Sequence, residues 1–299
     1  MTFTTKVDLK VFLQERREQI EAYLKETLKP NSAASRLWEA MAYSAQNGGK
    51  RLRGVLTLAT AEALQPSDWQ KVLPVAAGIE CIHSMSLVHD DLPCMDDAEL
   101  RRGKPTCHRA FDEATALLAG DALLVEGLAL CLKAEIDPPL QNKTISLILD
   151  AVGARGMTGG QMIDLFETGK DNLTLSQLEQ MHRLKTGALI KASVLAGAIL
   201  VNASEAQKLA LAGYAERLGL AFQIVDDLLD CEGDSAILGK QAGQDLAQNK
   251  CTYPKLLGET ESRHKAEGLI QEAKESLKEA GIEFEALYAI ADFVLERQS

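Results

Sequence analysis

The sequence predicts an all-α protein, folded as one large helical bundle. Apolar residues recur at helical spacing in segment after segment, and no segment alternates apolar and polar residues as a half-buried strand does. Glycine and proline pairs separate these segments, as at Gly48-Gly49 and Pro138-Pro139. With 299 residues, 46% of them hydrophobic, the chain can bury a large core. This length allows one domain or two, but no Pro/Gly/Ser-rich linker divides the chain, so we expect a single domain over residues 1–299.

Most predicted helices have a recognisable start or stop signal. The first, 7–28, has a one-sided apolar pattern and ends at Pro30. The segment 68–91 is apolar around most of its circumference, which is typical of a central helix. A cap at Thr174 or Ser176 opens a helix that runs past Lys185, and the polar, Gly-rich residues 231–249 are expected to form a loop over a site. The other predicted helices cover residues 32–46, 52–64, 113–133, 140–166, 204–230, 259–280 and 283–297.

Composition excludes several classes of function. The net charge of −11 argues against nucleic acid or an anionic membrane as the main partner, because both would repel such a surface. The N-terminus has no signal or transit character, and no stretch of about 18 uncharged apolar residues occurs. We therefore expect a cytoplasmic protein without stable membrane insertion. The six cysteines form no CxxC pair and the five histidines no HExxH motif, which fits reduced thiols better than disulfides or a zinc site.

Four carboxylates crowd into residues 90–97, directly after an apolar run. Like charges this close repel one another, so a fold that keeps them together should place a cation between them. Asp90 and Asp96 are six residues apart, which an unbroken helix would place on different faces. Pro93 removes a helix hydrogen bond, so a helix end there could return Asp96 to Asp90. Ideal periodicity would instead pair Asp90 with Asp97, which stays open as a weaker candidate.

A second acidic cluster, Asp226, Asp227 and Asp230, follows another apolar run. On a helix Asp226 and Asp230 are one turn apart and share a face, with Asp227 beside them. Carboxylates without a histidine or thiolate cluster favour a hard ion such as magnesium. Magnesium normally takes only a few ligands from the protein, and phosphate oxygens of a substrate occupy other coordination positions. The two clusters together therefore predict a magnesium site with a diphosphate as the bridging ligand.

Basic residues suited to a diphosphate lie near both acidic clusters. Lys50 and Arg53 are three residues apart at a helix start, an arrangement that can grip an anion. A second basic run, 101–104, follows the first acidic cluster within a few residues, and three lysines lie near the second: Lys185, Lys240 and Lys250.

These motifs, in this order, resemble the trans-isoprenyl diphosphate synthases: GGKRLR, HDDLPCMDDAELRRGKPTCH, GDALL, GGQ, KTGALI, FQIVDDLLD, LGK and KCTYP. The resemblance runs from about residue 43 to about residue 257. It implies an all-α bundle of the isoprenoid synthase type, usually a homodimer, with the active site in a central cavity between two Asp-rich helices. It further implies a magnesium-dependent enzyme that joins isopentenyl diphosphate to an allylic diphosphate: dimethylallyl, geranyl or farnesyl diphosphate.

The resemblance also implies roles for individual residues. It assigns several magnesium ions, three with diphosphate bound, to Asp90, Asp91, Asp96, Asp226, Asp227 and Asp230. It assigns the allylic diphosphate to Arg101, Lys185, Lys240 and Lys250, with Thr186 and Gln223 near the reacting groups. It assigns isopentenyl diphosphate to Lys50, Arg53, His83 and Arg102.

Product length depends, in the resembled family, on a wall just upstream of the first Asp pair. Bacterial farnesyl diphosphate synthases usually place Tyr or Phe there, whereas this chain has Met85 beside Ser84 and Ser86. The stretch resembles more closely the geranylgeranyl diphosphate synthases of plants and cyanobacteria. Because an unbranched Met leaves more room than an aromatic ring, we expect a C20 product, with a C15 product as the alternative.

Three other functions are weaker alternatives. Terpene cyclases and head-to-head synthases share the Asp-rich motif, but the second motif, Asp226 to Asp230, and the basic segment 48–53 argue against both. A non-catalytic subunit of a prenyl synthase tends to lose one Asp motif, and this chain keeps both.

Overall fold

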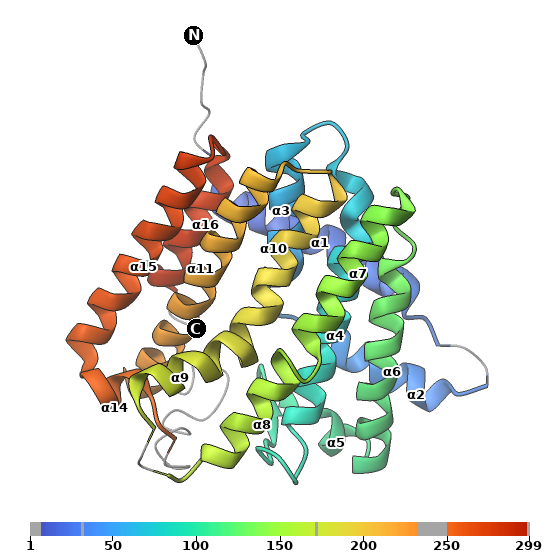
Figure 1. Cartoon of the computed structure of the whole chain (residues 1–299). Coiled ribbons are helices and arrows are strands. Elements are labelled where there is room, and N and C mark those ends of the chain that lie inside the picture. Colours follow the sequence, from blue (N-terminus) through green and yellow to red (C-terminus); the bar gives the residue numbers. More distant parts are fainter. Residues whose placement is uncertain (1–6, 31–32, 171–172, 233–249, 298–299) are drawn as a thin grey trace.

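A computed structural model describes residues 7–30, 33–170, 173–232 and 250–297. Helices make up nearly all of its regular structure, so the predicted all-α class is confirmed (Figure 1). The helices before residue 140 are α1 (Leu9–Thr27), α2 (Ser35–Ala45), α3 (Leu52–Leu64), the 3₁₀ turn η1 (Trp69–Val72), α4 (Leu73–Asp90), α5 (Cys107–Ala110), α6 (Glu113–Cys131) and α7 (Pro138–Val152). The later ones are α8 (Met157–Glu167), α9 (Leu175–His182), the π-helical turn η2 (Arg183–Gly187), α10 (Ala188–Leu200), α11 (Glu205–Glu232), α14 (Tyr253–Leu257), α15 (Glu259–Glu279) and α16 (Glu285–Glu296).

Helix α4 lies in the core, as its all-round apolar pattern predicts. It is buried from Val75 to Ile82 without interruption and packs most extensively on α6. The two helices touch where glycines face each other: a Cβ added at Gly127 would lie 2.7 Å from the carbonyl oxygen of Gly78. Helix α10 packs on α3, α7 and α11, and Figure 1 shows it between the α11, α15 and α16 side of the bundle and the α6 and α7 side.

Side-chain caps fix several helix starts. Asp8 accepts from the backbone N–H groups of the first turn of α1, and Asp112 does the same for α6. Of the two candidates for the start of α9, Thr174 is the cap, and it forms a reciprocal capping box with Gln177. The expected helix 140–166 is wrong as a single element. It divides into α7 and α8 because the backbone turns at Gly153 to Gly156, where a Cβ on Gly156 would lie 2.1 Å from the carbonyl oxygen of Ala151.

One short hairpin departs from the helix-only expectation. Strands β1 (Leu100–Arg101) and β2 (Lys104–Pro105) pair antiparallel, with Arg101 opposite Lys104. The two linking residues, Arg102 and Gly103, have φ of +56° and +74°, as a type I′ turn requires. The basic run 101–104 is therefore a tight hairpin, and its arginines lie just beyond the end of α4.

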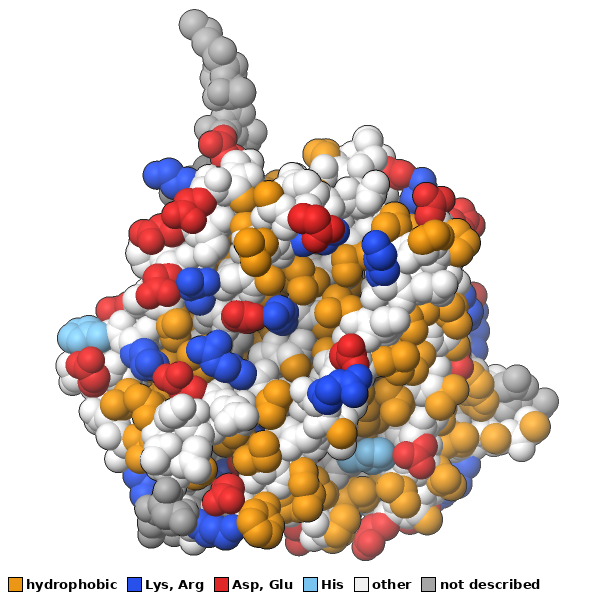
Figure 2. Space-filling view, in the orientation of Figure 1, with side chains coloured by type: hydrophobic (Ala, Val, Ile, Leu, Met, Phe, Trp, Pro, Cys, Tyr) orange, Lys and Arg blue, Asp and Glu red, His pale blue; other side chains and the backbone are white. Residues whose placement is uncertain are grey.

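Two helical stretches are long and apolar enough to cross a bilayer by length and composition alone, Trp69–Asp90 and Glu113–Cys131. The first is 67% buried inside the protein, as a core helix is. The second, α6, is 39% buried and packs on α4 with one face. Its other side exposes Leu118 and Val125, and Leu132, the residue after the helix, is exposed seven residues further on. Figure 2 shows apolar side chains gathered on the face over α6, α7 and α8. The six cysteines are present as thiols rather than disulfides, as expected.

The glycine contact between α4 and α6 can be tested by adding a single methyl group. Gly127→Ala should lower the free energy of unfolding by roughly 1–3 kcal/mol, because the methyl group would press on the α4 backbone. Gly268→Ala is the matched control, since Gly268 lies in α15 with no atom near its Cβ position. It should raise stability by about 0.5–1 kcal/mol. Urea unfolding measures both changes, and a Gly127→Ala protein as stable as the wild type would contradict the packing described here.

Candidate active site

One cavity of about 1190 Å³ collects most of the predicted site residues. Its wall is formed by the start of α3, the end of α4, the hairpin, α8, η2, α11 and α16. The predicted residues on it are Lys50, Arg53, His83, Met85, Ser86, Asp90, Asp96, Arg101, Arg102, Lys185, Thr186, Gln223, Asp226, Asp227 and Lys250. Asp91 and Asp230 are buried and are not part of this wall, and Lys240 lies outside the described residues.

The chain turns back after α4 so that Asp96 returns to Asp90. The backbone N–H of Asp96 donates to the carbonyl oxygen of Asp90 at 2.9 Å. Asp97 adopts a left-handed conformation with φ of +47°, and its side chain lies outward, 3.5 Å from Arg109. Of the two alternatives that the spacing left open, the structure places Asp96 on the same cavity wall as Asp90.

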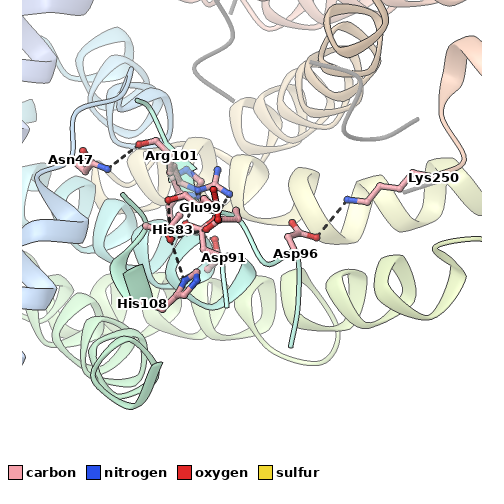
Figure 3. A network of polar contacts seen from close by, with 11 residues as sticks. Asn47, His83, Asp91, Asp96, Glu99, Arg101, His108 and Lys250 are labelled. Atoms are coloured by element: carbon pink, nitrogen blue, oxygen red, sulfur yellow. Dashed lines mark hydrogen bonds and ion pairs between the residues drawn. The ribbon is translucent and has the colours of Figure 1, made fainter. Parts of the chain in front are cut away.

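Asp91, which is buried outside the cavity wall, binds the guanidinium of Arg101, which is part of that wall. The Nε of Arg101 donates to both carboxylate oxygens at 2.9 Å, and an Nη donates to Oδ1 at 2.6 Å (Figure 3). Burial alone would lower the pKa of Arg101, but these hydrogen bonds outweigh it and raise the pKa. The Asp91 carboxylate is 3% exposed and is used in this contact, which leaves the Arg101 side chain fixed at the cavity wall.

A second group of basic residues surrounds the start of α3. Gly48, Gly49 and Arg51 all have positive φ, so the chain turns sharply here. Arg51 points inward, where it donates to the carbonyl oxygen of Ala45 at 2.6 Å and lies 3.8 Å from buried Glu80. This turn leaves Lys50 and Arg53, on either side of Arg51, on the cavity wall.

Arg102 and His83 complete this basic group. Arg102 donates to the carbonyl oxygen of Gly48 at 2.6 Å, and its guanidinium fills the space that a Cβ on Gly49 would need. Burial, reinforced by nearby arginines, lowers the pKa of Arg102 to about 10. His83 Nε2 lies 3.2 Å from Arg53, and because a guanidinium only donates, Nε2 accepts. Burial and the same arginines hold the pKa of His83 well below its usual value, so the ring is neutral.

The π-helical turn η2 presents Lys185 and Thr186 to the cavity. Glycines on both sides allow this: a Cβ on Gly160 would lie 2.2 Å from the backbone nitrogen of Lys185, and one on Gly219 3.1 Å from Gly187. The Lys185 ammonium donates to Asp164, a cavity residue that the sequence analysis missed. Burial acts against both charges, but the pairing outweighs it and leaves the pKa of Lys185 raised and that of Asp164 lowered. Asp164 lies four residues after Gly160 on α8, a helical spacing that could have suggested it.

The carboxylates of Asp226 and Asp227, in the second Asp motif, point in different directions. Asp226 faces the cavity with its side chain 40% exposed and lies 3.3 Å from Arg297. Asp227 is 2% exposed and accepts from the Gln223 side-chain amide and from the Tyr253 backbone N–H, each at 3.0 Å. Gln223 in turn accepts from the Thr186 hydroxyl at 3.0 Å. Consecutive helical residues are about 100° apart, which is why only one of the first two aspartates faces the cavity directly.

Arg297 is a second cavity residue that the sequence analysis missed. It follows α16, donates to the carbonyl oxygen of Phe222 at 2.7 Å and stacks 3.7 Å over the Phe222 ring. Burial lowers the pKa of Lys50, and the charge of Arg297 lowers it further. Nothing local in the sequence distinguishes Arg297 from a surface charge near a chain end.

The donor set fits an open magnesium site. Among the described residues, no group of three His, Cys, Asp or Glu side chains is close enough to hold a metal by itself. Asp90, Asp96 and Asp226 nevertheless line the same cavity, and burial, with the charge of Asp96, raises the pKa of Asp90 to about 6. Magnesium takes oxygen ligands and normally leaves several positions to water or phosphate, so these carboxylates suit a magnesium diphosphate better than a bare ion.

The rest of the cavity near the end of α4 is apolar. Met85, 7% exposed, lies on the wall with Ser86, Leu117 and Met162. Phe222 and Phe293, from α11 and α16, are the only Phe, Tyr or Trp residues in the described lining, and neither belongs to α4. In the described part of the chain, no Phe, Tyr or Trp ring therefore closes the cavity at Met85.

The pKa of Asp90 predicts how stability depends on pH. Because this pKa is about 6 in the folded chain against an ordinary 3.8, the folded chain binds more protons between these values, and ionisation of Asp90 destabilises it as the pH rises. Asp90→Asn should therefore stabilise the ligand-free protein by roughly 2–3 kcal/mol at pH 8 and by less at pH 5. Urea unfolding at both pH values measures this gain. Asp97→Asn, at the exposed neighbour, is the control. If Asp90→Asn stabilised the protein no more at pH 8 than at pH 5, the result would contradict the burial of the Asp90 charge.

Comparison with known proteins agrees with this geometry. The profile of the polyprenyl synthetase family matches residues 34–290. The geranylgeranyl diphosphate synthase of Cyanophora paradoxa is 42% identical over 99% of this chain and 98% of its own. The farnesyl diphosphate synthase of Geobacillus stearothermophilus is 43% identical over 96% of this chain and 97% of its own. A crystal structure of a geranyltransferase from Helicobacter pylori, complexed with magnesium and isoprenyl diphosphate, covers 98% of both chains with a TM-score of 0.85 at 32% identity. The chain therefore belongs to the polyprenyl synthetase family and is a short-chain trans-prenyltransferase.

Proposed function

We propose that this chain condenses isopentenyl diphosphate with dimethylallyl, geranyl and farnesyl diphosphates, head to tail and with magnesium, to give geranylgeranyl diphosphate. The observation that carries the proposal is one cavity with two basic regions. Arg101, Lys185 and Lys250 accompany the cavity-facing aspartates, whereas Lys50, Arg53, His83 and Arg102 gather around the start of α3. Two diphosphates can thus be held apart while their hydrocarbon parts meet.

The allylic diphosphate would bind between the two Asp motifs. Asp90, Asp96 and Asp226 would hold magnesium ions, three with diphosphate bound, and Arg101, Lys185 and Lys250 would contact the phosphate oxygens. When bound, magnesium would neutralise the diphosphate and make it a better leaving group. We assign Asp91 chiefly the positioning of Arg101, because its carboxylate is used in that contact. Asp230, also buried, and Lys240, outside the described residues, keep their predicted roles as proposals.

The chemistry needs charge stabilisation and a dry channel. Cleavage of the allylic C–O bond puts negative charge on the departing diphosphate, and the fixed cations Arg101 and Lys185 stabilise that charge as it develops. The allylic carbocation is left among apolar walls that exclude water. The double bond of isopentenyl diphosphate, held by the second basic group, attacks the cation. Loss of a proton to the released diphosphate then gives the lengthened, neutral allylic chain.

The proposed product length rests on Met85. A growing chain that enters beside α4 meets this flexible side chain rather than an aromatic ring. The C15 product is the second candidate, since relatives named farnesyl diphosphate synthase are as similar to this chain as relatives named geranylgeranyl diphosphate synthase.

Turnover and product sizing test both levels of the proposal. Purified protein with magnesium and labelled isopentenyl diphosphate should convert dimethylallyl, geranyl and farnesyl diphosphates to a C20 product. Met85→Tyr should stop most chains at C15, because its ring fills the channel, and the control Met85→Leu should keep C20. Chromatography of the dephosphorylated products measures chain length. A wild-type reaction that stops at C15 would refute the length assignment, and no turnover by the chain alone would favour a non-catalytic subunit.

We also propose that the chain acts as a cytoplasmic homodimer in which each subunit is one polyprenyl synthase domain. The exposed apolar side chains Leu118, Val125 and Leu132 support the dimer, because their seven-residue spacing forms one continuous stripe that a second copy can cover. Light scattering should give twice the chain mass, and Val125→Glu should reduce it toward the monomer. A monomeric wild type would reject this arrangement.

A further inference from the structure

A directed chain of hydrogen bonds links the second Asp motif to the π-helical turn. Asp227 accepts from the Gln223 amide, and Gln223 accepts from the Thr186 hydroxyl, with all three residues on the cavity wall. The Tyr253 backbone N–H donates to the other carboxylate oxygen of Asp227 at 3.0 Å. Gln223 and Asp227 of α11 therefore link η2, through Thr186, to α14, through Tyr253.

The chemistry of Asp227 sets the direction of the chain. An ionised carboxylate only accepts, so Gln223 must turn its NH₂ group toward Asp227 and its carbonyl oxygen toward Thr186. A carbonyl oxygen also only accepts, so the Thr186 hydroxyl must donate its hydrogen to Gln223. The hydroxyl oxygen then has only lone pairs for the cavity.

Burial keeps this arrangement in one orientation. Asp227 is 2% exposed and Thr186 is 9% exposed, so water does not compete freely for either group. The ring of His182 stacks on that of Tyr253, with centroids 5.7 Å apart, and His182 Nε2 lies 4.0 Å from Asp227.

We propose that Asp227 is a positioning residue that fixes the polarity of Thr186, so that the hydroxyl presents its negative end to the allylic carbocation. The inference rests on the proposed function, because only a reaction that develops positive charge in the cavity gains from this polarity. A dipole that is already oriented needs no reorganisation when the charge forms. The inference also separates the two adjacent aspartates, since both line the cavity but the Asp227 carboxylate is hydrogen-bonded within the protein.

Asp227→Asn tests the direction. The amide introduced at position 227 can keep its carbonyl oxygen toward the Tyr253 N–H, which turns its NH₂ group to Gln223. Gln223 must then reverse, and its NH₂ group donates to Thr186, whose hydroxyl hydrogen is left to point into the cavity. We expect kcat to fall by about 100-fold, as when one oriented dipole is lost from an active site. The KM values and the magnesium concentration for half-maximal rate should stay within about twofold of the wild type.

The double variant Gln223→Glu with Asp227→Asn is the matched rescue. The carboxylate introduced at position 223 can only accept, so it takes hydrogens from both the Thr186 hydroxyl and the new amide at position 227. The original direction is then restored with the same net charge and nearly the same shape. We expect kcat to recover at least about tenfold relative to Asp227→Asn alone. Gln223→Glu alone should not be active, because it faces the Asp227 carboxylate with a second one. Thermal unfolding confirms that each variant is folded.

The outcomes separate the inference from the proposed function. A large rise in the magnesium requirement of Asp227→Asn would make Asp227 a metal ligand and overturn the inference. A folded double variant without recovery would overturn it as well, because the direction of the hydrogen bonds would then not matter. Both results require an active wild type, so they leave the proposed function intact. A wild type without turnover would instead reject the proposed function, and with it the inference.

Discussion

Three carboxylates that face one cavity impose the constraint on which the rest of the site depends. Asp90, Asp96 and Asp226 line this cavity, and burial, with the charge of Asp96, raises the pKa of Asp90. The fold tolerates them because cations stand beside them: Lys250 lies 3.7 Å from Asp96, and Arg297 lies 3.3 Å from Asp226. A diphosphate that arrives with magnesium brings its own countercharge, so these cations can contact phosphate instead.

Several of the basic side chains at this site pair with an acidic side chain of the protein. Asp91 holds Arg101, Glu80 lies beside Arg51, and Asp164 pairs with Lys185. Such pairs are seldom a net gain in stability when they are buried. Their value lies in geometry, since a long side chain whose charged group is already held by an acid presents its charge in one place and needs little reorganisation when a substrate binds. The glycine contacts at Gly160 and Gly219 serve the same end by letting the π-helical turn sit close to its neighbours.

Much of this arrangement could be predicted from local sequence. The helices follow from apolar periodicity, and the two acidic clusters with the nearby basic runs indicated a diphosphate site. The shared helix face expected for Asp226 and Asp230 did not bring both to the cavity, since Asp230 is buried and is not part of its wall. Other features depend on the folded backbone. Asp96 rather than Asp97 lies with Asp90 because of the turn after Pro93, and the break in the expected helix 140–166 comes from close backbone approach at Gly156.

Contacts between distant segments were beyond prediction. Arg297 reaches the cavity only through the packing of the segment after α16, and the sequence alone shows no partner for it. The spacing of Asp164 from Gly160 could suggest its place on α8, but not its pairing with Lys185. The use of Asp91 against Arg101 was also hidden, because a pair of adjacent aspartates does not reveal which carboxylate faces the protein.

The central claim is that Asp90 and Asp96 on one side and Asp226 on the other bind one metal diphosphate. Crystals grown with manganese and inorganic diphosphate test it most directly, because anomalous scattering locates the metal. The account predicts manganese within about 2.3 Å of carboxylate oxygens of Asp90, Asp96 and Asp226, with diphosphate oxygens completing the coordination. Manganese bound instead to Asp91 or Asp97, or diphosphate bound away from both Asp motifs, would contradict it.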